Sequence, residues 1–476
     1  MSQRMDKLTK ALQALKAATF VRKRWVNALI LCILSAGVWT RATAYGNFRL
    51  SIGMSDTPSY ITSSRANLLS LQIFTSERLF TTNILYKLAN DPVNCPLTVV
   101  GNPAVGIELP RAILPCFDKI VLLQNVLSMI GWSFLALVIA RWLQNPLYKT
   151  LAVIIVLTFG FTPQIAEWDS ILSSESISLS VFSIVAGLTL EISQRIARDQ
   201  NHRSSATTKL LTILWLVIFV LWVFLRDVHL YACLITIVML LPLALMNKLQ
   251  PRTGGLLVIC ILTGVFILGM YTTQKSPRWE LPLFHVLDGR VFSDEGMVNY
   301  FASHFDMPRD PASPEYAEWF DSRGFRSYGI FLATHPGYVI TELMERSDYL
   351  SEGFIQPYFT TAEIPSRQKL LNIGQIVHPE TNAVILIDII LLAAMYGHVL
   401  RHPNARQWAW IWFAAWVFGY ACMSATLSFF GDNIGIHRHI FPAIETLRLL
   451  LWICLLVNMD LLVQKPETIT TVIGES

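Results

Sequence analysis

Charged residues are scarce in this sequence. Of its 476 residues, 15% are charged and 53% are hydrophobic, whereas a soluble globular protein has about 25% charged residues. The apolar residues come in blocks of roughly 20, which is long enough to cross a bilayer core of about 30 Å. The composition therefore excludes a chain of soluble domains and predicts an all-α polytopic membrane protein. The small net charge of +4 gives no support for nucleic-acid binding.

The sequence also has no internal repeat, no low-complexity stretch and no cysteine spacing typical of a metal site. Most of the seven cysteines lie inside apolar segments, where a cysteine is usually a small buried hydrophobe. Cys95 and Cys116 lie outside these segments, in one long connection, and are candidates for a disulfide. The middles of the apolar segments are almost free of charge, which argues against a carrier, because carriers place ionisable groups near the bilayer midplane.

Hydrophobic length predicts about ten membrane-spanning helices. The first begins at Trp25, too late and too long for a signal peptide. Two connections are long, residues 44–118 and 272–381, and we expect both to contain short helices. The predicted spans are 25–43, 119–139, 151–165, 171–190, 210–225, 230–246, 255–271, 383–400, 408–429 and 440–463.

Outside the bundle of residues 25–463, both termini have simple predicted roles. Residues 1–24 carry Leu8, Leu12 and Leu15 at helical spacing among lysines, which predicts a basic amphipathic helix on a cytoplasmic membrane surface. Residues 464–476 are expected to be a short cytoplasmic tail.

The distribution of lysine and arginine predicts the orientation. Alternate short connections are basic, and the others hold only Arg226 and Arg438, so the positive-inside rule assigns the basic set and both termini to the cytoplasm. Both long connections then lie on the opposite face of the membrane. We expect this to be a bacterial inner membrane; in a eukaryote the same face would be that of the lumen of the endoplasmic reticulum. The basic set comprises Arg141, Lys149, Arg195, Arg198, Arg203, Lys209, Lys248, Arg252, Arg401 and Arg406.

Acids and bases gather at the non-cytoplasmic helix ends. They occur in SDTPSYI after the first span, in AEWDSILSSES between the third and fourth, in RDVH between the fifth and sixth, and in GDNIGIHRHIFP between the ninth and tenth. A charge at membrane depth costs at least about 2.5 kcal/mol, so this concentration on one face suggests a shared site. The candidate residues are Asp56, Tyr60, Glu167, Asp169, Glu175, Arg226, His229, Asp432, His437, Arg438 and His439.

For single residues a simpler explanation competes, since such side chains are common at headgroup depth. It is the better one for Glu77, Arg78 and Asp227. Three basic or titratable residues in a row, His437 to His439, instead favour a functional role. Cations at headgroup depth can hold a lipid phosphate, and a fixed carboxylate can take a proton from an acceptor hydroxyl. Asp56 suits that role, and could also cap a helix beginning near Pro58.

These residues carry a resemblance to a known family. The Asp56 of SDTPSYI in the first outer loop, the acidic turn with Glu167 and Asp169, and RHIFP at the start of a late span resemble the GT-C superfamily of membrane glycosyltransferases. The resemblance implies an inverting enzyme that moves a sugar from a polyprenyl-phosphate carrier to a lipid, glycan or protein acceptor. It implies Asp56 as the general base and Arg438, with both neighbouring histidines, at the donor phosphate.

Several points stay open at this stage. A divalent cation, Mg or Mn, is an open question, with Asp56 and Asp169 as candidate ligands. Polar and aromatic residues of the second long loop, including His285 and His304, fit either an acceptor-binding cover or plain packing. Two other functions compete: a ligase or polymerase of lipid-linked glycans, with its chemistry in residues 272–381, and a carrier or flippase for a lipid-linked substrate.

Overall fold

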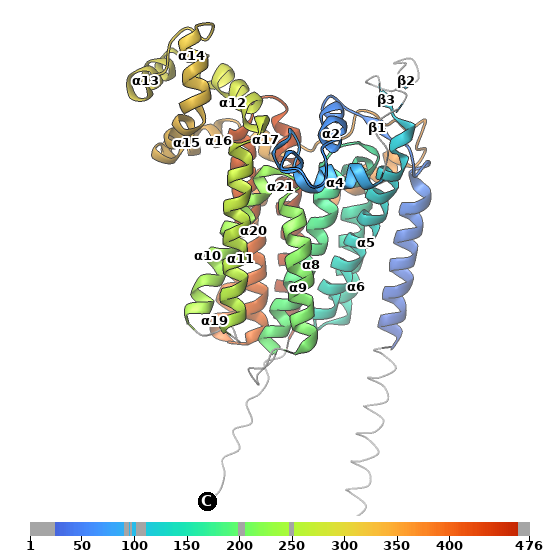
Figure 1. Cartoon of the computed structure of the whole chain (residues 1–476). Helices are drawn as coiled ribbons and strands as arrows, with labels where there is room; N and C mark the ends of the chain where they lie inside the picture. Colours follow the sequence, from blue (N-terminus) through green and yellow to red (C-terminus); the bar gives the residue numbers. More distant parts are fainter. Residues whose placement is uncertain are drawn as a thin grey trace, which may run out of the picture.

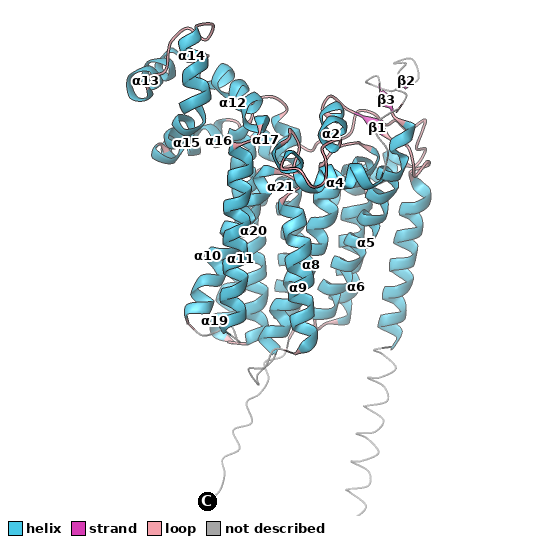
Figure 2. Ribbon diagram, in the orientation of Figure 1, coloured by secondary structure: helices cyan, strands magenta, loops and turns pink. Residues whose placement is uncertain are grey.

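The computed structural model describes residues 24–89, 95, 98–100, 111–198, 205–246 and 252–464. The predicted surface helix of residues 1–24 and the predicted tail lie outside this part of the chain, apart from Arg24 and Gln464. Within it, nine helices are long and apolar enough to cross a membrane, or ten if one bent pair is a broken span. The prediction of an all-α polytopic membrane protein with about ten spans is confirmed (Figure 2).

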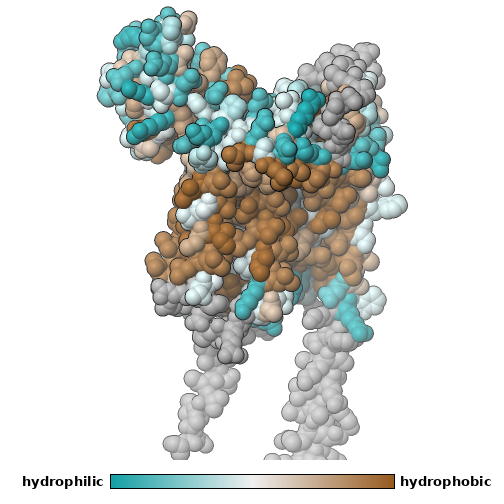
Figure 3. All heavy atoms as spheres, in the orientation of Figure 1, coloured by the Kyte–Doolittle hydropathy of each residue, from teal (hydrophilic) through white to brown (hydrophobic). Residues whose placement is uncertain are grey.

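The spanning helices stand side by side as one bundle surrounded by a hydrophobic band (Figures 1 and 3). Its central members, α8, α20 and α21, are mostly buried, whereas the first helix and α11 expose most of their side chains. The bounds are Arg24–Ala44 for the first helix, then α5 Asp118–Trp142, α6 Pro146–Phe161, α8 Glu175–Arg198, α9 Ala206–Val223, α10 Tyr231–Leu245, α11 Arg252–Gln274, α19 Ala383–Arg401, α20 Ala405–Gly431 and α21 Ile436–Val463.

The third predicted span differs from the structure at its outer end. Helix α6 stops at Phe161, and the chain continues through α7 (Pro163–Ala166) and the 3-10 helix η3 (Glu167–Ser170), with a bend of 46°. Pro163 causes the break, because a proline disfavours helical backbone in the residue before it, and Thr162 is extended. Glu167 and Asp169 therefore lie on a re-entrant turn packed inside the protein, with both side chains buried.

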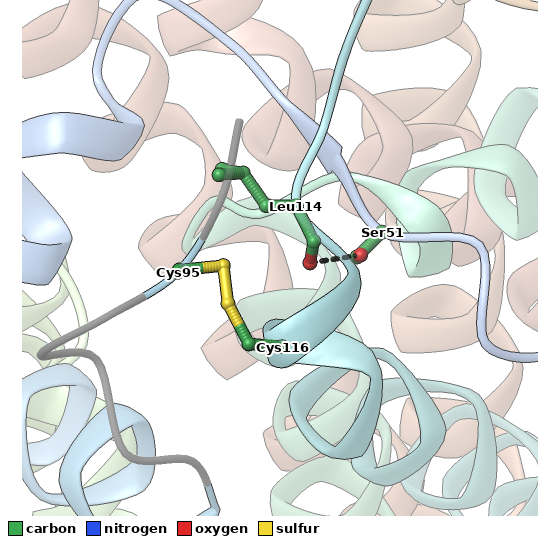
Figure 4. Close-up of a disulfide and its surroundings, with 4 residues drawn as sticks. All are labelled: Ser51, Cys95, Leu114 and Cys116. Carbon is green, nitrogen blue, oxygen red and sulfur yellow. Dashed lines mark hydrogen bonds between the residues drawn. A yellow bond between two sulfur atoms is a disulfide. The ribbon is translucent and has the colours of Figure 1, made fainter. Parts of the chain in front are cut away.

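The first outer connection folds over the bundle as short helices and a small sheet. The helices are α2 (Thr57–Ser64), α3 (Gln72–Thr75) and α4 (Phe80–Ala89). The antiparallel sheet, which the sequence analysis did not predict, has the order β1 (Ile52–Gly53), β3 (Arg111–Ile113), β2 (Thr98–Val100). Beside it, Cys95 and Cys116 form a disulfide, and the Ser51 hydroxyl donates a 2.5 Å hydrogen bond to the Leu114 carbonyl (Figure 4).

The second outer connection forms a lobe that extends sideways from one end of the bundle (Figure 1). We call residues 277–346 the outer lobe. Its aromatic core includes Phe301, Trp319 and Phe331, and α17 (Asp348–Ser351) and α18 (Arg367–Val377) follow it back across the bundle. The helices of the lobe are α12 (Glu280–Val286), α13 (Glu295–Phe305), α14 (Pro314–Trp319), α15 (Phe325–Thr334) and α16 (Pro336–Glu345).

Candidate functional site

A cavity of about 410 Å³ opens at the end of the bundle that carries both outer connections. Its wall is built from parts of the chain that are far apart in sequence: the first outer connection, the first residues of α8, α10 and α21, the last residues of α11 and α20, and the outer lobe. Charged side chains and a larger set of apolar side chains line it, and we call the part around Asp56, Arg438 and His439 its charged end.

The charged end is organised around Asp56. The backbone before it is held on both sides, because β1 pairs with β3 and Ile52 also forms a bridge with Ile171. The Thr57 hydroxyl donates a 2.9 Å hydrogen bond to the Leu172 carbonyl, which fixes the start of α2. Asp56 occupies the N-cap position of α2, as the sequence suggested, but its side chain makes no capping hydrogen bond. The carboxylate is left to face the cavity.

Arg438 pairs with this carboxylate. Helix α21 begins after Gly435, whose φ of 68° lies in the left-handed region that glycine adopts easily, so the chain turns sharply into the helix. Arg438 Nη2 lies 2.6 Å from Asp56 Oδ2, and its Nε lies 3.8 Å from Glu175 Oε1. One guanidinium thus links the first outer connection, α8 and α21.

Arg78 approaches Asp56 from the other side. Its Nη2 is 3.6 Å from Asp56 Oδ1, and its Nε donates a 2.7 Å hydrogen bond to the Ser59 hydroxyl. The guanidinium carbon lies 4.2 Å from the centre of the Tyr60 ring, a cation–π contact that orients the arginine. Tyr60 is held in turn by a 3.1 Å hydrogen bond from its hydroxyl to Ser174 Oγ.

A third arginine and two histidines continue the charged wall. Arg226 Nη2 is 3.4 Å from His439 Nδ1, and Arg438 Nη2 is 3.4 Å from His439 Nε2. Asp432 lies between two imidazoles, 3.0 Å from His285 Nδ1 and 3.5 Å from His439 Nε2. Because His285 belongs to α12, this contact joins the outer lobe to the bundle at the edge of the cavity.

Six residues that line the cavity carry a buried polar atom with no hydrogen-bond partner in the structure, and two of these atoms belong to side chains that contact His439 or Arg438. These two are Nη1 of Arg226, a donor, and Oε2 of Glu175, an acceptor. An unpaired buried polar group costs about 1–3 kcal/mol, and both atoms are covered by protein in this structure.

The rest of the cavity lining is mostly apolar. Leucine, valine, methionine and phenylalanine side chains from α10, α11, α12, α15 and α20 form it, including Leu230, Met270, Leu283, Leu332 and Phe430. The lining therefore suits a ligand that has both an anionic group and a hydrocarbon part.

The cavity brings together seven of the residues singled out from the sequence: Asp56, Tyr60, Glu175, Arg226, Asp432, Arg438 and His439. It also contains Glu77, Arg78 and Asp227, for which the simpler explanation was preferred, and Arg278, which was not considered. Asp227 is 3.3 Å from Arg278 Nε. Charge clustering in the sequence identified the first seven residues. Only the fold shows that the segments before α4 and α10 and after α11 bring Glu77, Arg78, Asp227 and Arg278 to the same cavity.

Four other candidates lie outside this cavity. Glu167 Oε1 is 2.6 Å from Arg367 Nε on α18, and Asp169 Oδ2 is 2.8 Å from Arg41 Nη2 on the first helix. His229 is buried against Trp222 and bonds to Ser178 and Tyr420. The ring of His437 lies 4.3 Å from that of Tyr349. The contacts of Glu167, Asp169 and His229 hold helices together.

The arrangement does not fit a divalent cation at Asp56. A hard cation needs several oxygen ligands that converge, but the Asp56 carboxylate faces two guanidinium groups, and Asp169 is bound by Arg41 in a separate network. The described residues contain no group of three histidines, cysteines or acids that could hold a metal ion.

Comparison with known proteins gives matches among solved structures alone. No family model matches the sequence, and no curated protein matches it. The structure is similar to the archaeal oligosaccharyltransferase AglB from Archaeoglobus fulgidus in complex with an inhibitory peptide and a dolichol-phosphate (11% identity, TM-score 0.42, covering 90% of this chain and 50% of that one).

It is also similar to the apo form of the Archaeoglobus fulgidus oligosaccharyltransferase (11% identity, TM-score 0.44, covering 90% and 50%). A third match is the form of that enzyme tethered to an acceptor peptide containing the NVT sequon (12% identity, TM-score 0.43, covering 90% and 49%). The chain spans about half the length of these structures.

Proposed function

We propose that this protein is a membrane glycosyltransferase that takes a sugar from a polyprenyl-phosphate carrier at the outer face of the membrane. The observation that carries the proposal is the pairing of Asp56 with Arg438 in a cavity whose lining is otherwise mostly apolar. A lipid-linked sugar phosphate has the same polarity: a hydrocarbon chain, then an anionic phosphate, then a hydroxyl-rich ring.

In this proposal the arginines bind the donor phosphate. Arg438, Arg226 and Arg78 lie along one wall, and guanidinium groups bind phosphate oxygens through strong, paired hydrogen bonds. As the bond between the sugar and the phosphate breaks, negative charge grows on the phosphate. Guanidinium groups already in place stabilise that charge without having to reorganise.

Asp56 is proposed as the general base. An acceptor hydroxyl attacks the anomeric carbon from the face opposite the phosphate, its proton passes to Asp56, and the polyprenyl phosphate leaves, which inverts the anomeric configuration. In the structure the Asp56 carboxylate forms an ion pair with Arg438. A donor phosphate competes for that guanidinium, so donor binding would free the base when it is needed. No step in this scheme uses a metal ion.

We also propose the finer features that the sequence suggested. The acceptor is a lipid, glycan or protein of the cell envelope, and the enzyme sits in a bacterial inner membrane with both termini in the cytoplasm. The outer lobe contributes α12 and α15 to the cavity, which supports a role for the second long loop in holding the acceptor or covering the site.

The deciding experiment compares Asp56→Asn with the unmodified protein in membranes, at matched expression. A radiolabelled polyprenyl-phosphate sugar pool is chased into lipid, glycan or protein products, and donor binding is measured separately. We expect transfer to fall by about 10²- to 10⁴-fold, the usual contribution of a general base, with donor binding retained. Unchanged transfer would remove Asp56 from the chemistry and favour a ligase that works through residues 272–381.

A further inference from the structure

The exposed hydrophobic side chains of the outer lobe are unevenly distributed. They lie on α12, α15 and α16, where Ile340 is 58% exposed and Met344 72% exposed. Residues 285–324, which include α13 and α14, expose no large hydrophobic side chain. The exposed set is Leu281, Phe284, Phe325, Ile330, Ile340 and Met344.

Helix α16 is apolar on two faces. Tyr338, Val339 and Leu343 pack against the cluster formed by the outer ends of α20 and α21. Ile340 and Met344 are four residues apart, so they lie together on another face of the helix. A helix with one protein partner needs only one apolar face, which leaves the Ile340–Met344 face to be explained.

The height of α16 on the molecule indicates what covers this face. The Tyr338 ring lies 6.2 Å from that of Phe430 near the end of α20, and the buried Arg290 donates a 2.7 Å hydrogen bond to the Phe429 carbonyl. The lobe is thus fixed to α20 where that span reaches the membrane boundary. It extends beyond the bundle with α15 and α16 on the side of the helix ends and with α13 and α14 above them (Figure 1).

We propose that the underside of the outer lobe, formed by α15 and α16, rests in the headgroup region of the outer leaflet. The occupant of the exposed apolar face is phospholipid of the membrane that holds the bundle, because a bilayer necessarily surrounds spans of this kind at that height. The hydrophobic band of the bundle reaches up to the base of the lobe, whose visible surface mixes hydrophilic and apolar residues (Figure 3). Helices with one apolar and one polar face lie in this way at membrane interfaces.

This contact has a consequence for the cavity. Phe325, Tyr328 and Leu332 of α15 line its apolar part, so lipids that support α15 hold one wall of the cavity at the membrane surface. The proposal concerns where the lobe sits and does not depend on glycosyl transfer.

The test uses the full chain in phosphatidylcholine liposomes, with an environment-sensitive fluorophore attached to one cysteine at a time. Cys32 and Cys260, the exposed free cysteines, are replaced by serine in the background, except that the lipid control keeps Cys260. Met344→Cys and Ile340→Cys report on the proposed face, Ser303→Cys on α13 is the aqueous control, and the native Cys260 of α11 is the lipid control. Quenching is measured with nitroxide-labelled lipid and with aqueous iodide.

We expect the labels at positions 344 and 340 to be quenched by nitroxide lipid to an extent comparable with the Cys260 label, and to be protected from iodide. The label at position 303 should respond to iodide only. Iodide quenching at position 344 equal to that at position 303 would place the lobe in water and overturn the proposal. Protection from both quenchers would also overturn it, because it would show that protein, such as a second copy of the chain, covers this face.

Discussion

At the scale of single residues, the basic side chains of the site each contact more than one charged partner. Arg438 contacts both Asp56 and Glu175, while His439 lies between Arg226, Arg438 and Asp432. Because each basic side chain is shared between partners, its guanidinium or imidazole group is held in place. A phosphate that enters the cavity therefore meets guanidinium groups whose hydrogen-bonding capacity is not fully used. Charge alone would not give this result, because a lysine in place of Arg438 could not reach both acids with the same planar geometry.

We therefore expect Arg438→Lys to weaken the use of the donor although it keeps the positive charge. Losing one hydrogen bond to a charged group costs about 1.5–3 kcal/mol, which corresponds to a rise of about ten- to hundredfold in the KM for the lipid-linked donor. Steady-state transfer assays at varied donor concentration measure this KM. Arg49→Lys is the matched control, because Arg49 forms an exposed ion pair with Asp118 away from the cavity; an equal change in both variants would argue against a special role for Arg438.

At the scale of helices and strands, the bundle depends on close approach as well as on apolar area. Lipid offers helices no hydrophobic reason to associate, so small residues and tight packing hold spans together. A Cβ added to Gly131 of α5 would lie 2.5 Å from the Ser180 carbonyl oxygen of α8. Backbone cannot move aside as a flexible side chain can, and α8 carries Glu175 at its first residue.

Gly131→Val should accordingly push α5 away from α8 and destabilise the protein by about 1–3 kcal/mol, the usual cost of overpacking. The apparent melting temperature in detergent, followed by size-exclusion chromatography with fluorescence detection, should fall. Gly264→Ala is the control, because nothing lies within 4 Å of a Cβ at that position, and it should melt no earlier than the unmodified protein. A stable Gly131→Val protein would show that this contact between α5 and α8 is not limiting.

The disulfide between Cys95 and Cys116 should stabilise the first outer connection. It closes a loop with a sequence separation of 21 next to β3, which pairs with the strand β1 that precedes Asp56, and next to the Ser51–Leu114 hydrogen bond (Figure 4). Closing a loop of this size typically contributes about 2–4 kcal/mol. Replacing both cysteines by serine should make residues 44–118 the first region cut by a protease added to intact vesicles, and transfer should become heat-sensitive. Unchanged cleavage would mean that the sheet alone holds this segment.

How far the sequence predicts the fold depends on the kind of signal. Long apolar runs mark the spans, since a bilayer demands length and hydrophobicity whatever the tertiary structure is. The end of α6 was placed too late, because a hydropathy window runs through Thr162 and Pro163 and does not register a change of direction. The contributions of Arg78 and Arg278 to the cavity depend on contacts between distant segments, and no local pattern in the sequence specifies those.

At the scale of the whole molecule, charge and architecture agree on a sidedness. The first helix starts, and α21 ends, at the end of the bundle opposite the outer lobe (Figure 1). Arg141, Lys149, Arg401 and Arg406 lie near the ends of α5, α6, α19 and α20 that are joined at that same end, which the positive-inside rule assigns to the cytoplasm. In the proposed orientation the cavity and the disulfide lie on the other side, where a disulfide persists and where a lipid-linked sugar would be used.

This sidedness predicts the labelling pattern of two cysteine variants in intact cells, again with Cys32 and Cys260 replaced by serine. A membrane-impermeant maleimide should label Ser303→Cys on the outer lobe directly. It should label His402→Cys, in the exposed turn after α19, only after the cells are permeabilised. The reverse pattern would place the cavity in the cytoplasm, where it would meet nucleotide-activated sugars instead of carrier lipids exposed at the outer face. The arginines could still bind a phosphate there, but the apolar part of the cavity would have no role in binding a soluble donor, and the lipid-linked donor would have to be given up.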